Sequence, residues 1–309
     1  MPGVAADPTG EKDWLPRLDT GQDQLTAIEL GRDRLVLIEL SDPVAHVFDR
    51  ATREWSEVRW PDLPGADWGR RLPVLGPDGR LYVFTPGTHG SPPPGGWPTG
   101  PNGEADDSGA EGDTYDLWSV SLTDPSDTRS EALRVGAVGF GDGTMVWTDS
   151  ENARARVHVR DLATGEETSF DPELGDRCNL NGFDVAGQRI AITQYCGTYG
   201  GGVRDDRVQV VTTDGEPVVT VQDSGVDGGD LVGGGDYLLL AASTGATGGT
   251  YVYDFAEGRL EQVADERSSW MVGTGPTPGD TFMWTTPVGK ELRLFGDKGA
   301  TVHLGELVG

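Results

Sequence analysis

Hydrophobic residues along this chain occur in short runs, and each run directly follows a turn that contains Gly or Asp. No segment has apolar residues at i, i+3, i+4 and i+7, which is the pattern of an amphipathic helix. The recurring unit is instead a turn followed by strand-forming residues, which predicts an all-β chain built from hairpins. Six copies occur: LGRDR-LVLIEL, LGPDGR-LYVF, FGDGT-MVWT, VAGQR-IAIT, VGGGD-YLLL and TPGDT-FMWT.

The spacing of these copies is nearly constant. Successive strands begin 46, 64, 45, 47 and 45 residues apart, at Leu35, Leu81, Met145, Ile190, Tyr237 and Phe282. A period of this length with several short strands is typical of a β-propeller, in which each blade is a four-stranded antiparallel sheet. We predict a single six-bladed propeller over residues 23–309, with blades at about 25–60, 70–135, 136–171, 178–224, 228–266 and 269–308.

Two segments fall outside the repeat. Residues 1–22 are an N-terminal extension, which we expect to be partly disordered or to add an edge strand through Leu15–Leu18. Residues 86–114 form the insertion that lengthens the second blade, and they are too rich in Gly, Pro and acidic residues to pack. We therefore expect this insertion to be disordered.

A second motif recurs near the outer edge of the predicted blades, in VFDRATREW (47–55), VRDLATGEE (159–167) and VYDFAEGRL (252–260). Its Asp can accept backbone N–H groups of the turn, and Gly165 and Gly258 suit a position with positive φ. Arg53 replaces this Gly in the first copy. Through this D-x-A-x-G turn and the inner hairpins, the chain resembles six-bladed TolB-like and WD40-like propellers. The resemblance implies the fold and brings no catalytic residues with it.

The strand order also predicts where a ligand would bind. Because propeller strands alternate in direction, the connections between blades and the loops between the second and third strands lie on one face. These are the long connections, so we call this side the loop-rich face, and rigid scaffolds usually bind ligands through such loops. Its candidate ligand contacts are Trp68, Arg70, Arg177, Asn179, Asp227, Asp230, Glu266 and Trp270.

These residues would line a funnel for a small ligand, a basic peptide or a hard cation. In the alternative interpretation, the Trp side chains are wedges between blades and the acidic groups cap turns. The segment DSGVDGGD (223–230) places carboxylates at close spacing but lacks the full EF-hand pattern and its closing Glu. No cofactor is predicted, and calcium is the ion that Asp227 and Asp230 would hold.

The charge of the chain narrows the choice of partners. With 24 Lys and Arg against 51 Asp and Glu, the net charge is −27, and no basic stripe is present to meet phosphates. This disfavours nucleic acids and anionic membranes as partners, and fits either a cationic partner or a solvated acidic surface. No apolar run is long enough to cross a membrane, and we expect a monomer.

Catalytic motifs are sparse. The histidines, at positions 46, 89, 158 and 303, form no metal-binding pair, and no nucleophile elbow or phosphate-binding loop occurs. A pair of carboxylates suited to glycoside hydrolysis carries little information in a chain with 51 acidic residues.

The chain has two cysteines, Cys178 and Cys196, at the two ends of the inner hairpin of the fourth blade. If this hairpin turns at Ala186–Gly187, the cysteines lie opposite each other or nearly so. Facing Cα atoms are then about 4.5 or 5.5 Å apart, within the range of a disulfide. We predict a Cys178–Cys196 disulfide, against the alternatives of two reduced thiols or a redox pair. A disulfide favours export over the cytosol.

The N-terminal residues do not form a signal peptide. The protein is therefore expected either to be cytoplasmic or, as the disulfide favours, to be extracytoplasmic through a segment missing from this chain. The leading hypothesis is a non-enzymatic module that binds a protein, peptide or small molecule on the loop-rich face. The alternative is a calcium-dependent propeller hydrolase or lyase with its site at the axis of the same face, and a third is a structural domain of a larger anchored protein.

Overall fold

The computed structural model describes residues 3–4, 25–30, 34–39, 43–49, 51–61, 63, 73–86, 115–149, 155–175, 178–196, 206–222, 224–242, 248–265, 270–273, 282–285, 291–295 and 301–308. Throughout these ranges the regular elements are β-strands. No helix long and apolar enough to cross a membrane occurs in the described part of the chain.

Five four-stranded antiparallel sheets follow one another along the chain, each built from consecutive strands. They are β2 (Leu25–Leu30), β3 (Arg34–Glu39), β4 (Val44–Asp49) and β5 (Glu54–Arg59); β6 (Val74–Leu75), β7 (Arg80–Pro86), β8 (Tyr115–Ser121) and β9 (Thr128–Val135); β10 (Val138–Gly141), β11 (Thr144–Thr148), β12 (Val157–Asp161) and β13 (Glu167–Phe170); β14 (Cys178–Ala186), β15 (Arg189–Cys196), β16 (Arg207–Thr212) and β17 (Pro217–Val221); and β18 (Val226–Gly234), β19 (Tyr237–Ala242), β20 (Gly249–Asp254) and β21 (Arg259–Ala264). The predicted β-propeller with four antiparallel strands per blade is therefore correct in its class.

The number of four-stranded blades is not the predicted one, because five have this form rather than six. The C-terminal strands β22 (Trp270–Gly273), β23 (Phe282–Thr285), β24 (Glu291–Phe295) and β25 (Thr301–Val308) belong to a five-stranded sheet. Its fifth strand is β1 (Gly3–Val4), which pairs antiparallel with Val308 and Leu307 of β25. The chain thus joins its two ends through this sheet. The expected pairing segment, Leu15–Leu18, and the insertion after Pro86 lie outside the described residues.

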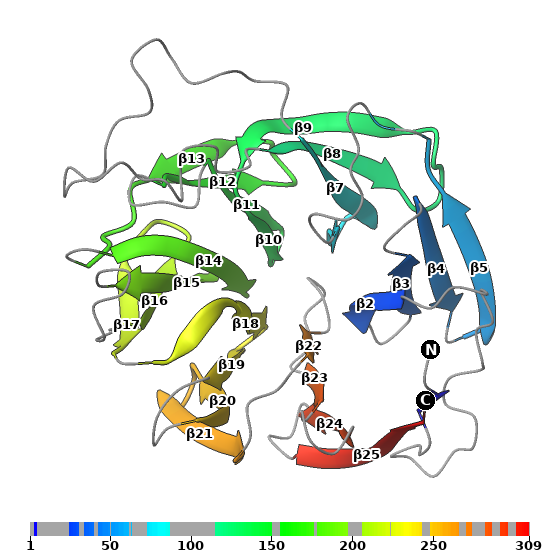
Figure 1. Ribbon diagram of the computed structural model, residues 1–309. Coiled ribbons are helices and arrows are strands. Elements are labelled where there is room, and N and C mark those ends of the chain that lie inside the picture. Colours follow the sequence, from blue (N-terminus) through cyan, green and yellow to red (C-terminus); the bar gives the residue numbers. More distant parts are fainter. Residues whose placement is uncertain are drawn as a thin grey trace.

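The sheets stand around a common centre, as Figure 1 shows. The first strand of each sheet, such as β10, β14 and β18, lies toward the middle, and the last strand, such as β13, β17 and β21, lies at the outer rim. Loops that join strands at the same end of these sheets therefore gather on one face.

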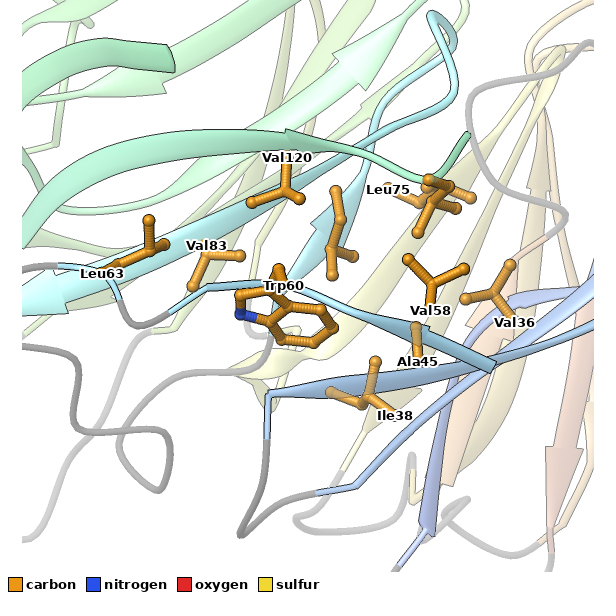
Figure 2. Packing of buried hydrophobic residues seen from close by; sticks show 11 residues of the cluster. Val36, Ile38, Ala45, Val58, Trp60, Leu63, Leu75, Val83 and Val120 are labelled. Atoms are coloured by element: carbon orange, nitrogen blue, oxygen red, sulfur yellow. The ribbon is translucent and has the colours of Figure 1, made fainter. Parts of the chain in front are cut away.

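Neighbouring sheets bury apolar side chains against each other. Between the first two sheets, Trp60 packs in a buried cluster with Val58 and Ile38 of one sheet and Val83 of the next, as Figure 2 shows. Trp60 leaves β5 at the start of the connection to the next sheet, so its indole fills the space between blades. A propeller is held together by such contacts because each sheet packs on those beside it.

The repeated Asp turn has the predicted hydrogen bonds. Oδ1 of Asp161 accepts the N–H groups of Ala163 and Thr164 at 2.9 and 2.7 Å, and Asp49 and Asp254 accept the equivalent N–H groups in their own turns. The backbone N–H of Thr164 lowers the pKa of Asp161, because it favours the charged carboxylate. Arg53, which replaces the turn glycine, has φ of 59° and is the one non-glycine residue with positive φ in the described ranges.

Candidate functional site

Few of the predicted ligand contacts fall where the structure describes side chains. Trp68, Arg70, Arg177 and Glu266 lie outside the described residues. Asp227 and Asp230 belong to β18 and Trp270 begins β22, with side chains outside the described set. Asn179 is described: it lies half-buried in β14, beside Cys178 and opposite Tyr195. The site can therefore be built at the fourth sheet.

The disulfide at this sheet is confirmed. Cys178 and Cys196 are bonded, with their Cα atoms 4.0 Å apart, and both are buried. They are register partners at the end of the β14–β15 hairpin that opens onto the loop-rich face. The bond thus ties the strand that enters this sheet to the strand from which residues 197–205 depart.

The predicted turn of this hairpin was wrong by one residue. Ala186 pairs with Arg189, so the turn is Gly187–Gln188 rather than Ala186–Gly187. An unbroken ladder from this turn would place Cys178 opposite residue 197. A β-bulge between Leu180 and Gly182 shifts the register by one residue and brings Cys178 opposite Cys196.

Two buried glutamines brace the chain beside the disulfide. Oε1 of Gln194 accepts the backbone N–H of Gly175 at 3.0 Å, and its Nε2 donates to Oε1 of Gln209 at 2.8 Å. The Cys178 N–H donates to the Gly175 carbonyl at 3.0 Å. Gly175 belongs to the connection between the third and fourth sheets, so these bonds fix the end of this connection on the loop-rich face.

Arg207 lies against the same connection. A Cβ added at Gly175 would overlap the guanidinium of Arg207 and lie 2.9 Å from Sγ of Cys178, so a larger residue there would have to displace Arg207 and crowd the disulfide. The connection between the fourth and fifth sheets is held at the same end. Ser224, in this connection, donates through its N–H and its Oγ to the carbonyl of Asp206, at 2.8 and 3.1 Å. We call Gly175, Cys178, Gln194, Cys196 and Gln209, which the disulfide and the glutamine hydrogen bonds tie together at the end of the fourth sheet, the platform.

Closer to the centre of the ring, the carboxylate of Asp184 links two sheets. Its Oδ2 accepts the N–H of Gly233 in β18 at 2.9 Å, and its Oδ1 accepts the N–H of Val185 at 2.8 Å. Burial raises the pKa of Asp184 to about 6, although both N–H donors favour the charged form. On the other side of Asp184 lies Gly139 of β10, which has no side chain. A Cβ at Gly139 would be 3.3 Å from Oδ1 of Asp184 and 3.1 Å from Cγ2 of Val185, so glycine lets the two strands approach closely.

The raised pKa of Asp184 predicts a pH dependence of stability. Because the folded state binds this proton more tightly than the unfolded state, the contribution of Asp184 to the unfolding free energy falls as pH rises from about 4 to about 6. The total change is about 3 kcal/mol at most. Urea unfolding of the wild type and of Asp184→Asn from pH 3.5 to 7.5 measures it, since the substituted side chain does not titrate. If the two stability curves run parallel through this range, Asp184 has an ordinary pKa.

Loss of the disulfide is predicted to lower the unfolding free energy by about 3 kcal/mol, the chain-entropy value for a loop of 18 residues. The double variant Cys178→Ser, Cys196→Ser and the reduced wild type should unfold at the same denaturant concentration. Reductant should not affect the double variant, which serves as the control. A wild-type protein whose unfolding midpoint is insensitive to reductant would contradict this prediction.

The residues that brace the platform were not among the sequence candidates. Gln194 and Gln209 are buried polar residues within largely apolar runs of their strands, and a polar residue at such a position must be hydrogen-bonded. These polar positions were the available signal. In the described residues, no group of three or more His, Cys, Asp and Glu side chains is arranged to hold a metal ion.

The fold and this platform define a β-propeller with an elaborated face. No family model matches the chain, and no curated protein matches its sequence. The likeness to solved structures is at the level of fold. A chain of the mitotic checkpoint complex is 10% identical, with a TM-score of 0.51 over 94% of this chain and 85% of that one.

Peptidase propellers are similar too. The β-propeller domain of the Trilobed protease from Pyrococcus furiosus is 9% identical, with a TM-score of 0.52 over 91% of this chain and 84% of that domain. An acylaminoacyl peptidase in complex with Z-Gly-Gly-Phe-chloromethyl ketone is 11% identical, with a TM-score of 0.56 over 92% of this chain and 45% of that one. At such identities these structures share the propeller fold with this chain, and the fold alone does not determine function.

Proposed function

We propose that this protein is an extracytoplasmic, non-enzymatic binding module that holds a protein, peptide or small-molecule ligand on its loop-rich face. The observation that carries the proposal is the platform at the fourth sheet, where the Cys178–Cys196 disulfide and the Gln194–Gly175 hydrogen bond hold the chain at the base of the loops. Rigid support under the loops of a binding face lowers the entropy lost when a ligand binds.

The compartment follows from the same feature. A disulfide persists in oxidising surroundings and is rare in the cytosol. The acidic chain, at net charge −27, favours a partner with positive charge and disfavours nucleic acid. The same net charge makes two copies of the chain repel each other, so we expect the protein to be a monomer.

Photo-crosslinking can test which face binds. Tyr195 lies next to Cys196 at the loop-rich end of β15, whereas Gln188 is exposed in the turn at the opposite end of the hairpin. The photoreactive residue p-benzoylphenylalanine is placed at one position or the other, and the protein is irradiated with the extracellular fraction of its source. Defined adducts that form from position 195, and that excess wild-type protein suppresses, are expected. Adducts from position 188 alone would place binding on the other face, and no adducts from either would oppose a binding role.

The competing hypothesis is a calcium-dependent hydrolase or lyase with its ion at Asp227 or Asp230. It requires one tightly held ion per chain, which elemental analysis of the purified protein detects. It also requires a lower melting temperature after addition of EDTA, restored by calcium. If the protein holds such an ion, and if EDTA lowers its melting temperature and calcium restores it, the enzyme hypothesis would be favoured over the binding module.

A further inference from the structure

The outer strand of the fourth sheet, β17 (Pro217–Val221), has no charged side chain. Charged residues are a common device that keeps a foreign strand from pairing with an exposed sheet edge. The outer strands of the other four-stranded sheets each have at least one: Glu54, Glu57 and Arg59 in β5, Arg129, Glu131 and Arg134 in β9, Glu167 in β13, and Arg259 and Glu261 in β21. Among the outer strands of the five four-stranded sheets, β17 is therefore the one edge without a charged residue.

The backbone of β17 can accept another strand over part of its length. β17 is the last strand of its sheet, so no described strand lies on its outer side. Pro217 lacks an N–H, and Val218 is the extra residue of a bulge, so the beginning of the strand is irregular. From Val219 to Val221 the ladder with β16 is regular. The C-terminal sheet shows that a rim strand of this protein accepts such a short addition, because Gly3–Val4 pairs with β25.

Apolar side chains are exposed on the outer strands of this sheet and of the next. Val218 and Leu260 are the two exposed large hydrophobic residues of the described chain, with 45% and 42% of their surface accessible. Leu260 lies in β21, the outer strand of the neighbouring sheet (Figure 1), and is the register partner of Tyr253. Tyr253, Val219 and Val221 all pack on the same buried cluster between the two sheets. We call Val218, Val219, Val221, Tyr253 and Leu260 the rim patch.

The charges around the rim patch indicate the occupant. Asp214 and Glu216, in the turn before β17, are exposed and carry negative charge. Arg259, beside Leu260, is neutralised by Glu257 and Glu261 at 3.0 and 3.4 Å. A second copy of this chain, also at −27, would be repelled. A basic segment would be attracted.

We propose that the rim patch binds an extended segment of another protein by strand addition to β17, and that this segment has β-branched apolar residues flanked by Lys or Arg. Main-chain hydrogen bonds to Val219–Val221 would supply affinity, and the flanking cations would supply preference, as in other strand-addition complexes. This surface lies on the rim, apart from the loop-rich face, and does not depend on the function proposed for that face.

The test uses two fluorescent peptides, one with Val-Thr-Val-Thr-Val between pairs of Lys and one with the same core between pairs of Glu. Anisotropy titrations with the full chain should show saturable binding of the Lys peptide, at least tenfold tighter than that of the Glu peptide and weakened by salt. Val218→Lys should weaken binding at least tenfold. Thr168→Lys, at an exposed position of the outer strand β13, should leave it unchanged.

Hydrogen exchange adds a readout of the backbone. The Lys peptide should slow exchange of the amides in 218–221 and leave those in 167–170 unaffected. Equal binding by both variants, equal binding of both peptides, or no binding at all would overturn the proposal. A dimer in sedimentation that Val218→Lys dissociates would also overturn it, because the occupant would then be a second copy. Failure of the crosslinking experiment on the loop-rich face would leave this result intact.

Discussion

Replacing Arg80 by Met is expected to lower the unfolding free energy by about 3 kcal/mol, the upper end of the range for a hydrogen bond to a charged group. Arg80 is 7% exposed at its side chain and lies at the start of β7. Its Nε donates to Oγ of Ser119 at 2.7 Å, and its guanidinium reaches Oδ2 of Asp127 at 2.6 Å and the carbonyl oxygens of both residues. Met would leave the buried oxygen atoms of Ser119 without this donor, while the half-exposed carboxylate of Asp127 would keep Arg129.

The effect should extend to the next sheet. Ser119 donates to Oε1 of Glu131 at 2.5 Å, and Glu131 forms an ion pair with Arg160 of β12 at 3.1 Å. Arg80 therefore anchors a chain of polar contacts between the second and third sheets, and its removal should weaken their packing.

Arg129→Met is the matched control, because Arg129 pairs with the same carboxylate at 2.9 Å but is 60% exposed. Two hydrogen bonds hold the pKa of Asp127 below its ordinary value; the one from Arg80 has the larger effect and the one from Arg129 the smaller. An exposed pair contributes little, so Arg129→Met should change the unfolding free energy by less than about 1 kcal/mol. Urea unfolding at pH 7 measures both variants. Similar losses for the two would mean that the buried position of Arg80 has no special weight.

The fold class could be predicted because each repeat is specified by residues that lie close together in the sequence. A turn with Gly or Asp followed by an apolar strand recurs along the chain, with a two-residue turn in the third, fourth and fifth sheets, and each hairpin can be recognised without knowing its neighbours. The Asp161 and Asp254 turns are local in the same way: acceptor, donors and glycine lie within a few residues of each other. The number of four-stranded blades could not be predicted in this way, because it depends on the pairing of β1 with β25, which lie at opposite ends of the chain.

The disulfide shows how far local reasoning extends. The predicted pairing of Cys178 with Cys196 is confirmed, yet the turn was misplaced by one residue and the bulge at Asn181 was not foreseen. A turn at Ala186–Gly187 would place Cys178 opposite residue 195, whereas the actual turn alone would place it opposite residue 197; the bulge shifts the register by one residue and brings it opposite Cys196. Neighbouring positions of a hairpin are close enough for such a prediction to tolerate one of these errors.

The links between blades could not be predicted in this way. Asp184 accepts an N–H from Gly233, 49 residues further along, and Gln194 holds a glycine of the connection between sheets. Both contacts depend on how two sheets are placed in the ring, which no single repeat specifies. A polar residue in an apolar strand signals that a partner exists, and only the assembled ring identifies it.

Replacing Gly233 by Ala is expected to lower the unfolding free energy by about 3 kcal/mol or more, although the change adds one methyl group. Gly233 lies in the inner strand β18, where a Cβ would be 2.5 Å from the carbonyl carbon of Val185 and 2.9 Å from the N of Ala186 in β14. These are backbone atoms, which a change of rotamer cannot move. The two inner strands would have to separate, and this would stretch the hydrogen bond from Gly233 to Asp184, now 2.9 Å long.

Gly143→Ala separates this steric effect from the ordinary effect of losing a glycine. Gly143, in the turn between β10 and β11, has φ of 71° and no atom within 4 Å of an added Cβ, so Ala there introduces backbone strain alone, of about 1 kcal/mol. Chemical unfolding of both variants gives the comparison, and the yield of soluble protein replaces it if Gly233→Ala does not fold. Stabilities within about 1 kcal/mol of each other would contradict the prediction, because the inner strands would then tolerate separation. A larger loss at Gly233 would establish that close backbone contact between the inner strands holds the fourth and fifth sheets in place beneath both proposed binding surfaces.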